Sequence, residues 1–139
     1  MTTPDTRSVI VEKDFPHPPG KVWRALTDSA LIEQWLMKND FRPVVEHSFQ
    51  LRIDPVPGWN GVIDCEVLSM DEGKSLSYSW GTLGTQTVVT FTLTPTGTGT
   101  HLRVEQAGFG KDQEANYKGA FYGWQKFLGG LERVVDGLD

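Results

Sequence analysis

The sequence predicts an α+β fold in which a curved antiparallel sheet wraps around one long C-terminal helix, with two short helices after the first strand. Apolar residues recur at steps of three and four from Tyr117 to Leu138, which is typical of a helix with one buried face. From His47 to Ala107, apolar and polar residues instead alternate in runs that turn segments separate. Strands joined by short turns form an antiparallel sheet with one dry face, and the amphipathic helix supplies the cover that this face needs.

The first third of the chain predicts one strand and two short helices. Val9 and Phe15 share one face of an extended segment. Pro19 suits the first turn of a helix, and Asp28 or Ser29 can cap a second helix because their side-chain oxygens accept hydrogen bonds from free backbone N–H groups. The expected elements are a strand over residues 9–15, helices over residues 20–27 and from Asp28 or Ser29 to Leu36, and a loop over residues 37–46.

The middle of the chain predicts five strands. Phe49, Leu51 and Ile53 alternate with polar residues and are expected to share one face, whereas Asp64 and Glu66 fall on the outer face of the next strand. Segments rich in glycine, proline and aspartate between the runs have the composition of turns. The expected strands span residues 47–53, 61–70, 75–80, 89–93 and 101–107, with residues 81–86 as a connection.

The terminal helix is the only long helix that we expect. Each of its glycines costs about 0.5–1 kcal/mol relative to alanine, so tertiary packing must hold the helix together. We expect its C-terminal part to seal the core, while Tyr117, Phe121 and Trp124 reach a pocket. The glycines then let the helix approach the sheet closely or flex as a lid. They are Gly119, Gly123, Gly129 and Gly130.

The composition favours one cytoplasmic domain over residues 8–139, preceded by a loose segment over residues 1–7. The chain of 139 residues has a net charge of −5 and no run of lysine or arginine, which argues against a nucleic-acid binder. No stretch of about 18 apolar residues or apolar leader is found, so we expect neither a membrane span nor a secretion signal. Cys65 is the single cysteine, which excludes an internal disulfide and a cysteine-rich metal cluster.

Several short segments, in this order along the chain, carry a resemblance to a known family. They are Pro19–Asp28, Leu31–Trp35, Gly61 at a strand start, Ser75–Trp80, Gly99–Val104 and Gly123–Leu131. Together they resemble the helix-grip (START-like, SRPBCC) superfamily, and within it the bacterial homologues of the activator of the heat-shock protein 90 ATPase. The resemblance implies a helix-grip fold with an elongated cavity between the sheet and the terminal helix. It implies no particular ligand, because this scaffold hosts many functions.

Aromatic residues are expected to line that cavity, with Tyr78 and Gln106 as its polar groups and Cys65 as a weaker third. The alternative reading is a filled core, since burying one such ring stabilises a fold by roughly 1.5–3 kcal/mol; it is favoured for Trp23 and Phe91, which lie in the middle of elements. The expected ligand-binding residues are Trp35, Phe49, Tyr78, Trp80, Gln106, Phe109, Tyr117, Phe121 and Trp124.

The remaining polar residues predict no metal site, no cofactor and no catalytic group. The histidines are scattered without metal-ligand spacing: His17 is expected in solvent, and His47, near the pocket rim, is the only one considered for catalysis. Asp64 and Glu66 face outward, and Cys65 reads as a small buried apolar residue. No phosphate-binding or dinucleotide motif occurs.

The sequence therefore favours a protein that binds a small, largely apolar molecule without a cofactor, and favours it over an enzyme. One alternative is regulation of a chaperone ATPase, although the eukaryotic activators carry a separate N-terminal domain for which this sequence has no room. Another is a polyketide-cyclase-like enzyme in which His47, Tyr78 or Gln106 positions the substrate. Homodimerisation through a sheet edge or through the loop residue Trp59 stays open.

Overall fold

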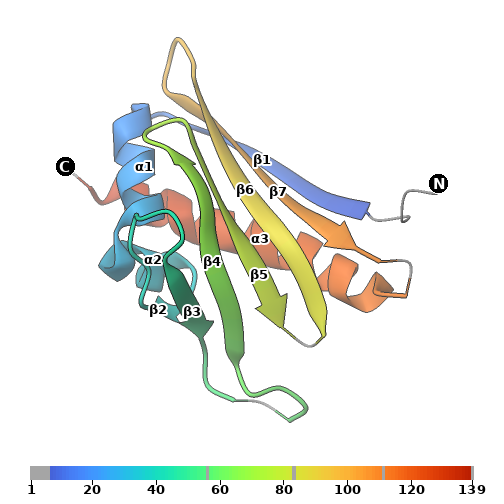
Figure 1. Cartoon of the computed structure of the whole chain (residues 1–139). Helices are drawn as coiled ribbons and strands as arrows, with labels where there is room; N and C mark the ends of the chain where they lie inside the picture. The colour runs from blue at the N-terminus through green and yellow to red at the C-terminus, as the bar shows by residue number, and fades with distance from the viewer. Residues whose placement is uncertain (1–6, 56, 83, 111, 139) are drawn as a thin grey trace.

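Figure 1 shows the computed structural model of the chain, in which a curved sheet covers one long helix. The structure describes residues 7–55, 57–82, 84–110 and 112–138. Its elements are β1 (Arg7–Phe15), α1 (Pro19–Thr27), α2 (Ser29–Trp35), β2 (Lys38–Asn39), β3 (Ser48–Arg52), β4 (Val62–Asp71), β5 (Ser75–Thr82), β6 (Thr85–Pro95), β7 (Thr100–Phe109) and α3 (Glu114–Asp136). All neighbouring strands are antiparallel, in the order β1-β7-β6-β5-β4-β3-β2. This arrangement confirms the predicted α+β helix-grip fold.

The two short helices form as their sequences predict. Proline occupies the first turn of α1, and the Asp28 carboxylate caps α2 by accepting from the backbone N–H groups of Ala30 and Leu31 at 3.0 and 3.4 Å. The indole Nε1–H of Trp35 donates to the carbonyl of Ala25 at 2.8 Å, which ties α2 to α1. Both helices lie beside the C-terminal half of α3 (Figure 1).

Helix α3 begins at Glu114, three residues before the predicted start at Tyr117. The buried residues of α3 are Trp124, Leu128, Leu131 and Val135. Their spacing of four, three and four positions confirms the predicted apolar face. Gly130 faces α2, where an added Cβ would lie 3.5 Å from the backbone of Trp35. In the part of the chain that the structure describes, no helix is both long and apolar enough to cross a membrane.

Four details of the sheet differ from the sequence-based expectations. Lys38 and Asn39 form β2, a two-residue strand paired with β3 that lies inside the predicted 37–46 loop. Residues 81–86 are mostly strand, because β5 and β6 extend to Thr82 and from Thr85. Ile53 lies beyond the end of β3 and is 42% exposed, so it does not share the buried face of Phe49 and Leu51. Arg7 belongs to β1, whereas the rest of the predicted loose segment, residues 1–6, lies outside the described residues.

Two histidines lie outside the sheet's buried face and contact carboxylates. The predicted exposure of His17 is wrong, because its side chain is only 17% exposed and its Nε2 lies 2.7 Å from Oδ1 of Asp136 near the end of α3. His101 lies on the outer face of β7, with Nδ1 2.6 Å from Asp14 and Nε2 2.9 Å from Glu12, both on β1. Hydrogen bonds to these two carboxylates, Glu12 first, raise the pKa of His101 above its ordinary value of 6.5.

Gly99 allows the connection between β6 and β7 to pass against the end of β1. A Cβ at this position would lie 1.9 Å from the carbonyl oxygen of Phe15 and 2.8 Å from the backbone nitrogen of His17. Both contacts are with backbone, so no side chain can move away to relieve them. Next to this contact, Thr100 Oγ1 donates to the carbonyl of His17 at 2.7 Å.

Gly99→Ala should lower the free energy of unfolding by roughly 1–3 kcal/mol, because the added methyl group overpacks a backbone contact. Gly97→Ala is the matched control, since its Cβ would meet nothing within 4 Å in the same turn. Urea unfolding followed by circular dichroism measures both variants. Equal midpoints for the two would contradict the close approach.

The imidazole of His101 should titrate above pH 6.5 in an NMR experiment, and Glu12→Gln should move its pKa back toward that value. Because the folded-state pKa is raised, the stabilisation is fully present below the unfolded pKa and is lost as the pH rises through the folded pKa. His101→Gln should therefore lower the urea midpoint at about pH 5.5 and have little effect at about pH 9. The opposite pH dependence would show that these contacts do not stabilise the protonated ring.

Candidate functional site

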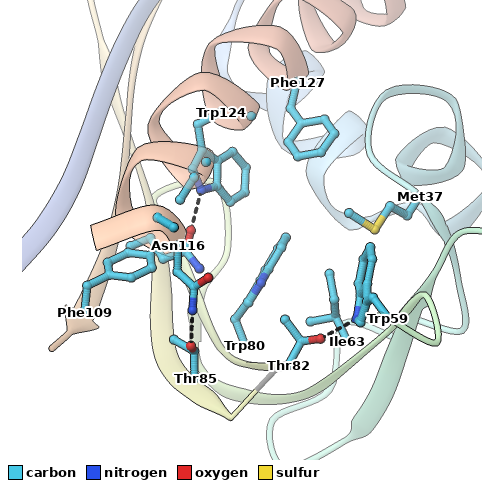
Figure 2. Close-up of a pocket in the computed structure, with 15 residues that line it drawn as sticks. Met37, Trp59, Ile63, Trp80, Thr82, Thr85, Phe109, Asn116, Trp124 and Phe127 are labelled. Carbon is cyan, nitrogen blue, oxygen red and sulfur yellow. Dashed lines mark hydrogen bonds between the residues drawn. The ribbon is translucent and has the colours of Figure 1, made fainter. Parts of the chain in front are cut away.

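A cavity of about 370 Å³ lies between the sheet and the N-terminal half of α3 (Figure 2). Its walls come from β4, β5, the start of β6, β7, α3 and two loop side chains, Met37 and Trp59. Most of the lining is aromatic or aliphatic. The aromatic residues are Trp59, Trp80, Phe109, Trp124 and Phe127.

The aromatic walls pack against one another as well as facing the cavity. The rings of Trp80 and Trp124 lie 5.6 Å apart, and the ring of Phe127 stands edge-on to Trp124 at 5.7 Å. Figure 2 shows Trp124 and Phe127 on the helix side, and Trp59 across the cavity from them beside Met37. The cavity is thus bounded by ring surfaces on several sides.

Small residues on α3 leave the space open. Residues at positions 115, 119 and 123, four apart on one side of the helix, are alanine or glycine, and Ala120 lies beside them. A Cβ at Gly119 would meet nothing within 4 Å, and one at Gly123 would touch only the ring of Phe127, at 3.7 Å. The two glycines lower the stability of the helix relative to alanine. Because they carry no side chain, the volume that a side chain would fill remains part of the cavity.

A buried chain of hydrogen bonds fixes the helix against the sheet at this point. The Nε1–H of Trp124 donates to Oε1 of Gln106 at 2.7 Å, and Nε2 of Gln106 donates to Oγ1 of Thr87 at 2.9 Å. The Thr87 hydroxyl donates onward to the carbonyl of Trp80 at 3.2 Å. Gln106 is 3% exposed, and both ends of its amide are occupied within the protein.

Two further groups of hydrogen bonds lie at the cavity wall. The Nε1–H of Trp59 donates to Oγ1 of Thr82 at 2.7 Å, and this hydroxyl donates to the carbonyl of Val62 at 3.0 Å. At the tip of the β5–β6 hairpin, Oγ1 of Thr85 accepts from Nδ2 of Asn116 at 2.5 Å (Figure 2). The same oxygen accepts from Nε2 of Gln113 at 3.0 Å. These contacts orient Trp59 and connect the hairpin to the first turn of α3.

Four of the residues expected at the site line the cavity: Trp80, Gln106, Phe109 and Trp124. Three others, Trp35, Phe49 and Tyr78, are buried in the hydrophobic core and do not line this cavity. Trp35 is 5% exposed and bonded to α1, and the ring of Tyr78 packs 5.2 Å from Phe49. Trp23 and Phe91 are buried in the same core, as the filled-core reading favours.

Tyr117 and Phe121 also lie outside the cavity lining. Tyr117 packs edge-on to Phe109 at 5.9 Å, and its other contact is the guanidinium of Arg7, 4.1 Å from the ring centroid. Phe121 is 41% exposed, so the expectation that it reaches the pocket is wrong. The reason is rotational. The cavity side of α3 shares Ala120, Trp124 and Phe127 with the predicted apolar stripe but turns toward positions 116, 119 and 123, which leaves Phe121 outside the lining.

Sequence reasoning missed several cavity residues. Trp59 is considered in the sequence only as a loop residue for a dimer contact, but it is half-buried and lines the cavity wall. Asn116 precedes the predicted helix start, and Phe127 was placed in the stripe without a role at the site. The spacing of Ala115, Gly119 and Gly123 was the available signal, because three small residues on one helix side mark where side chains are missing.

The candidate catalytic groups do not converge on the cavity. His47 stacks on Phe49 and its Nε2 lies 3.0 Å from the carbonyl of Asp40, away from the cavity lining. Burial, and then the charge of Cys65, raise the pKa of Tyr78 well above its ordinary value of 10.0. Of the three residues considered for a cyclase-like reaction, only Gln106 lines the cavity.

Cys65 and the neighbouring carboxylates are not arranged as a catalytic group. Burial, followed by the carboxylates of Asp64 and Asp40, raises the pKa of the Cys65 thiol from 9.0 to about 12, so the thiol stays protonated near neutral pH. Asp64 and Glu66 are exposed on the outer face, as predicted. Among the described residues, no group of three or more His, Cys, Asp and Glu side chains is placed to hold a metal ion.

Comparison with solved structures finds the same fold across nearly the whole chain. Protein MLL2253 from Mesorhizobium loti is 52% identical, with a TM-score of 0.90 over 96% of this chain and 99% of that one. DynU16, from the dynemicin biosynthetic locus, is 25% identical with a TM-score of 0.80 over 94% of this chain and 47% of DynU16. BH1534 from Bacillus halodurans is 25% identical with a TM-score of 0.79 over 93% and 96% of the two chains.

No curated protein matches the chain in sequence. Residues 16–136 match the family described as Activator of Hsp90 ATPase homolog 1-like protein, which spans both short helices, most of the sheet and all of α3. The chain therefore belongs to the Activator of Hsp90 ATPase homolog 1-like family.

Proposed function

We propose that this protein binds a small, largely apolar molecule in the cavity between the sheet and α3, and that residues 8–139 act as one ligand-binding domain. The observation that carries the proposal is the cavity of about 370 Å³ walled by aromatic rings. Ligand sites are typically concave, apolar and roughly 300–1,000 Å³ in volume. The pocket is partly open to solvent, and the small residues of α3 that face it leave room for an occupant to enter.

The proposed contacts combine predicted and newly identified residues. Trp80, Phe109 and Trp124 supply ring surface from the predicted set, and Trp59 and Phe127 complete the enclosure. Gln106 acts through Trp124, whose indole it holds in place. Binding in this form needs neither a metal nor a cofactor.

Binding is favoured over catalysis by the state of the polar groups at the cavity. None of the described lining side chains is an acid, a histidine, a lysine or a cysteine, and the amide of Gln106 is already bonded at both ends. General acid–base catalysis requires a group within reach of the substrate that can gain or lose a proton near neutral pH. The polyketide-cyclase-like alternative therefore has no candidate base among these residues.

Regulation of a chaperone ATPase is the second candidate, and the family description favours it. The surface of α3 offers one feature for such a contact, an exposed aromatic pair in which Phe121 is 41% and Tyr122 is 74% exposed. Purified protein added to an Hsp90 ATPase assay tests the idea. A change in ATP turnover that disappears in the Phe121→Ser, Tyr122→Ser double variant would place this function above ligand binding.

Gly119→Leu should abolish binding of an apolar fluorescent probe, N-phenyl-1-naphthylamine, or weaken it by at least about tenfold, because the new side chain occupies the cavity. Gly129→Leu is the matched control: its Cβ also meets nothing within 4 Å, but it does not line the cavity. Both substitutions replace a helical glycine, so both variants should fold with equal or greater stability.

Probe titration followed by fluorescence, with thermal unfolding of each variant, measures the effect. Unchanged affinity in a folded Gly119→Leu protein would show that the probe binds elsewhere and that the cavity is not the site.

A further inference from the structure

We propose that the ligand is an uncharged molecule built of flat rings, carrying one hydrogen-bond donor, and that the cavity rejects anionic amphiphiles and flexible acyl chains. This inference rests on the proposed function, because it names the chemical class that the same cavity accepts. Three properties of the wall support it: it carries no charge, most of its polar groups are already hydrogen-bonded within the protein, and its rings are held rigidly.

The wall offers no counter-charge to an ionised ligand. None of the fifteen described lining residues has an ionisable side chain. An ionised carboxylate or sulfonate moved from water into such a site loses its hydration and gains no partner, which is among the most unfavourable transfers in proteins. The net charge of −5 on the chain adds long-range repulsion of anions.

Most polar atoms of the wall are already bonded within the protein. The indole N–H groups of Trp59 and Trp124 donate to Thr82 and Gln106, and Gln106 is itself bonded to Thr87. A ligand rich in hydroxyl or carbonyl groups would therefore lose bonds to water and find few replacements.

Two lining residues are exceptions. The indole N–H of Trp80 makes no hydrogen bond with the described residues, and Asn116 supplies a free acceptor. Its Nδ2 donates to Thr85, while its carbonyl oxygen Oδ1 makes no hydrogen bond with the described residues, and the side chain lies at the cavity wall (Figure 2). An amide oxygen accepts up to two hydrogen bonds. One O–H or N–H group at the matching end of the ligand can therefore bind here.

The aromatic walls are held in fixed orientations. Gln106 holds the indole of Trp124, Thr82 holds that of Trp59, and the ring of Trp80 packs against Trp124 at 5.6 Å. Rigid ring surfaces gain most from rigid ring ligands, which stack or pack edge-on without losing internal freedom. A flexible acyl chain loses the freedom of each rotatable bond on entering the same space.

Two pairs of probes separate these properties in calorimetric and fluorescence titrations of the full chain. N-phenyl-1-naphthylamine and 8-anilino-1-naphthalenesulfonate share the same rings and amine but differ in one sulfonate. 1-Dodecanol and dodecanoate share an acyl chain and differ in charge. We expect N-phenyl-1-naphthylamine to bind at least about tenfold more tightly than the sulfonate and more tightly than 1-dodecanol. Only signal that is lost in Gly119→Leu counts as cavity binding.

A matched pair of variants tests the hydrogen-bond acceptor. Asn116 and Gln113 both donate to Thr85, but only Asn116 lines the cavity. Asn116→Leu should weaken N-phenyl-1-naphthylamine binding by about 3- to 10-fold, the usual effect of one lost hydrogen bond, whereas Gln113→Leu should not. Equal losses in both variants would assign the effect to the Thr85 contact and overturn the acceptor role of Asn116.

The outcomes distinguish this inference from the proposed function. If the sulfonate or dodecanoate binds in the cavity as tightly as its neutral partner, the charge exclusion is wrong while ligand binding stands. If 1-dodecanol binds more tightly than the naphthylamine, the preference for rings is wrong while ligand binding again stands. If no probe gives a signal that Gly119→Leu removes, both this inference and the proposed function are overturned.

Discussion

The buried hydrogen bonds of Gln106 fix the rotation of α3 against the sheet, and the rest of the structure depends on this rotation. A glutamine in the middle of an apolar sheet is costly unless both ends of its amide are bonded, and here Trp124 and Thr87 supply both bonds. The chain of contacts crosses from α3 through β7 and β6 to the backbone of β5. It fixes which side of α3 faces the sheet. Because a helix presents different residues at every rotation, it also decides which residues bound the cavity.

The two halves of α3 therefore have different structural roles. Beyond Trp124, Leu128, Leu131 and Val135 pack into the core, where α1 and α2 close against the helix. Before Trp124, the helix also contacts the sheet, but the small residues of this half leave a pocket between the two unfilled. The hypothesis that the glycines let the helix approach the sheet closely is not met at these positions, since Gly130 lies against α2 and Gly119 faces open space. The well-packed half anchors the helix, so the other half can line a cavity.

The fold could be predicted because its signals are periodic. Alternation along the strands and the three-to-four spacing in α3 survive in the structure, and both caps and turns fall close to their expected positions. The site was harder to predict. An apolar stripe on a helix does not say which part meets a packed core and which part meets a void, so Phe121 was placed inside although it is 41% exposed. Tyr78 points inward as expected, but it packs among Phe49 and Phe91 and does not reach the cavity. The curvature of the sheet decides this difference, and the alternation of residues does not encode it. Trp59 lies in a loop without periodicity, and no pattern in the sequence brings it to the wall.

The pairing of β1 with β7 has a consequence for the order in which the protein folds. Phe15 lies opposite Thr100 and Arg7 opposite Phe109, so β1 forms its ladder with β7, which is synthesised after the other described strands. Contacts so distant in sequence are entropically costly to close, and proteins rich in them fold slowly. The local hairpins from β4 to β7 can form first, which leaves β7 as a temporary open edge. In the finished sheet β1 covers that edge, and the opposite border is β2, which is only two residues long. Until β1 pairs, the edge of β7 is therefore open, and afterwards β1 itself is the border strand on this side.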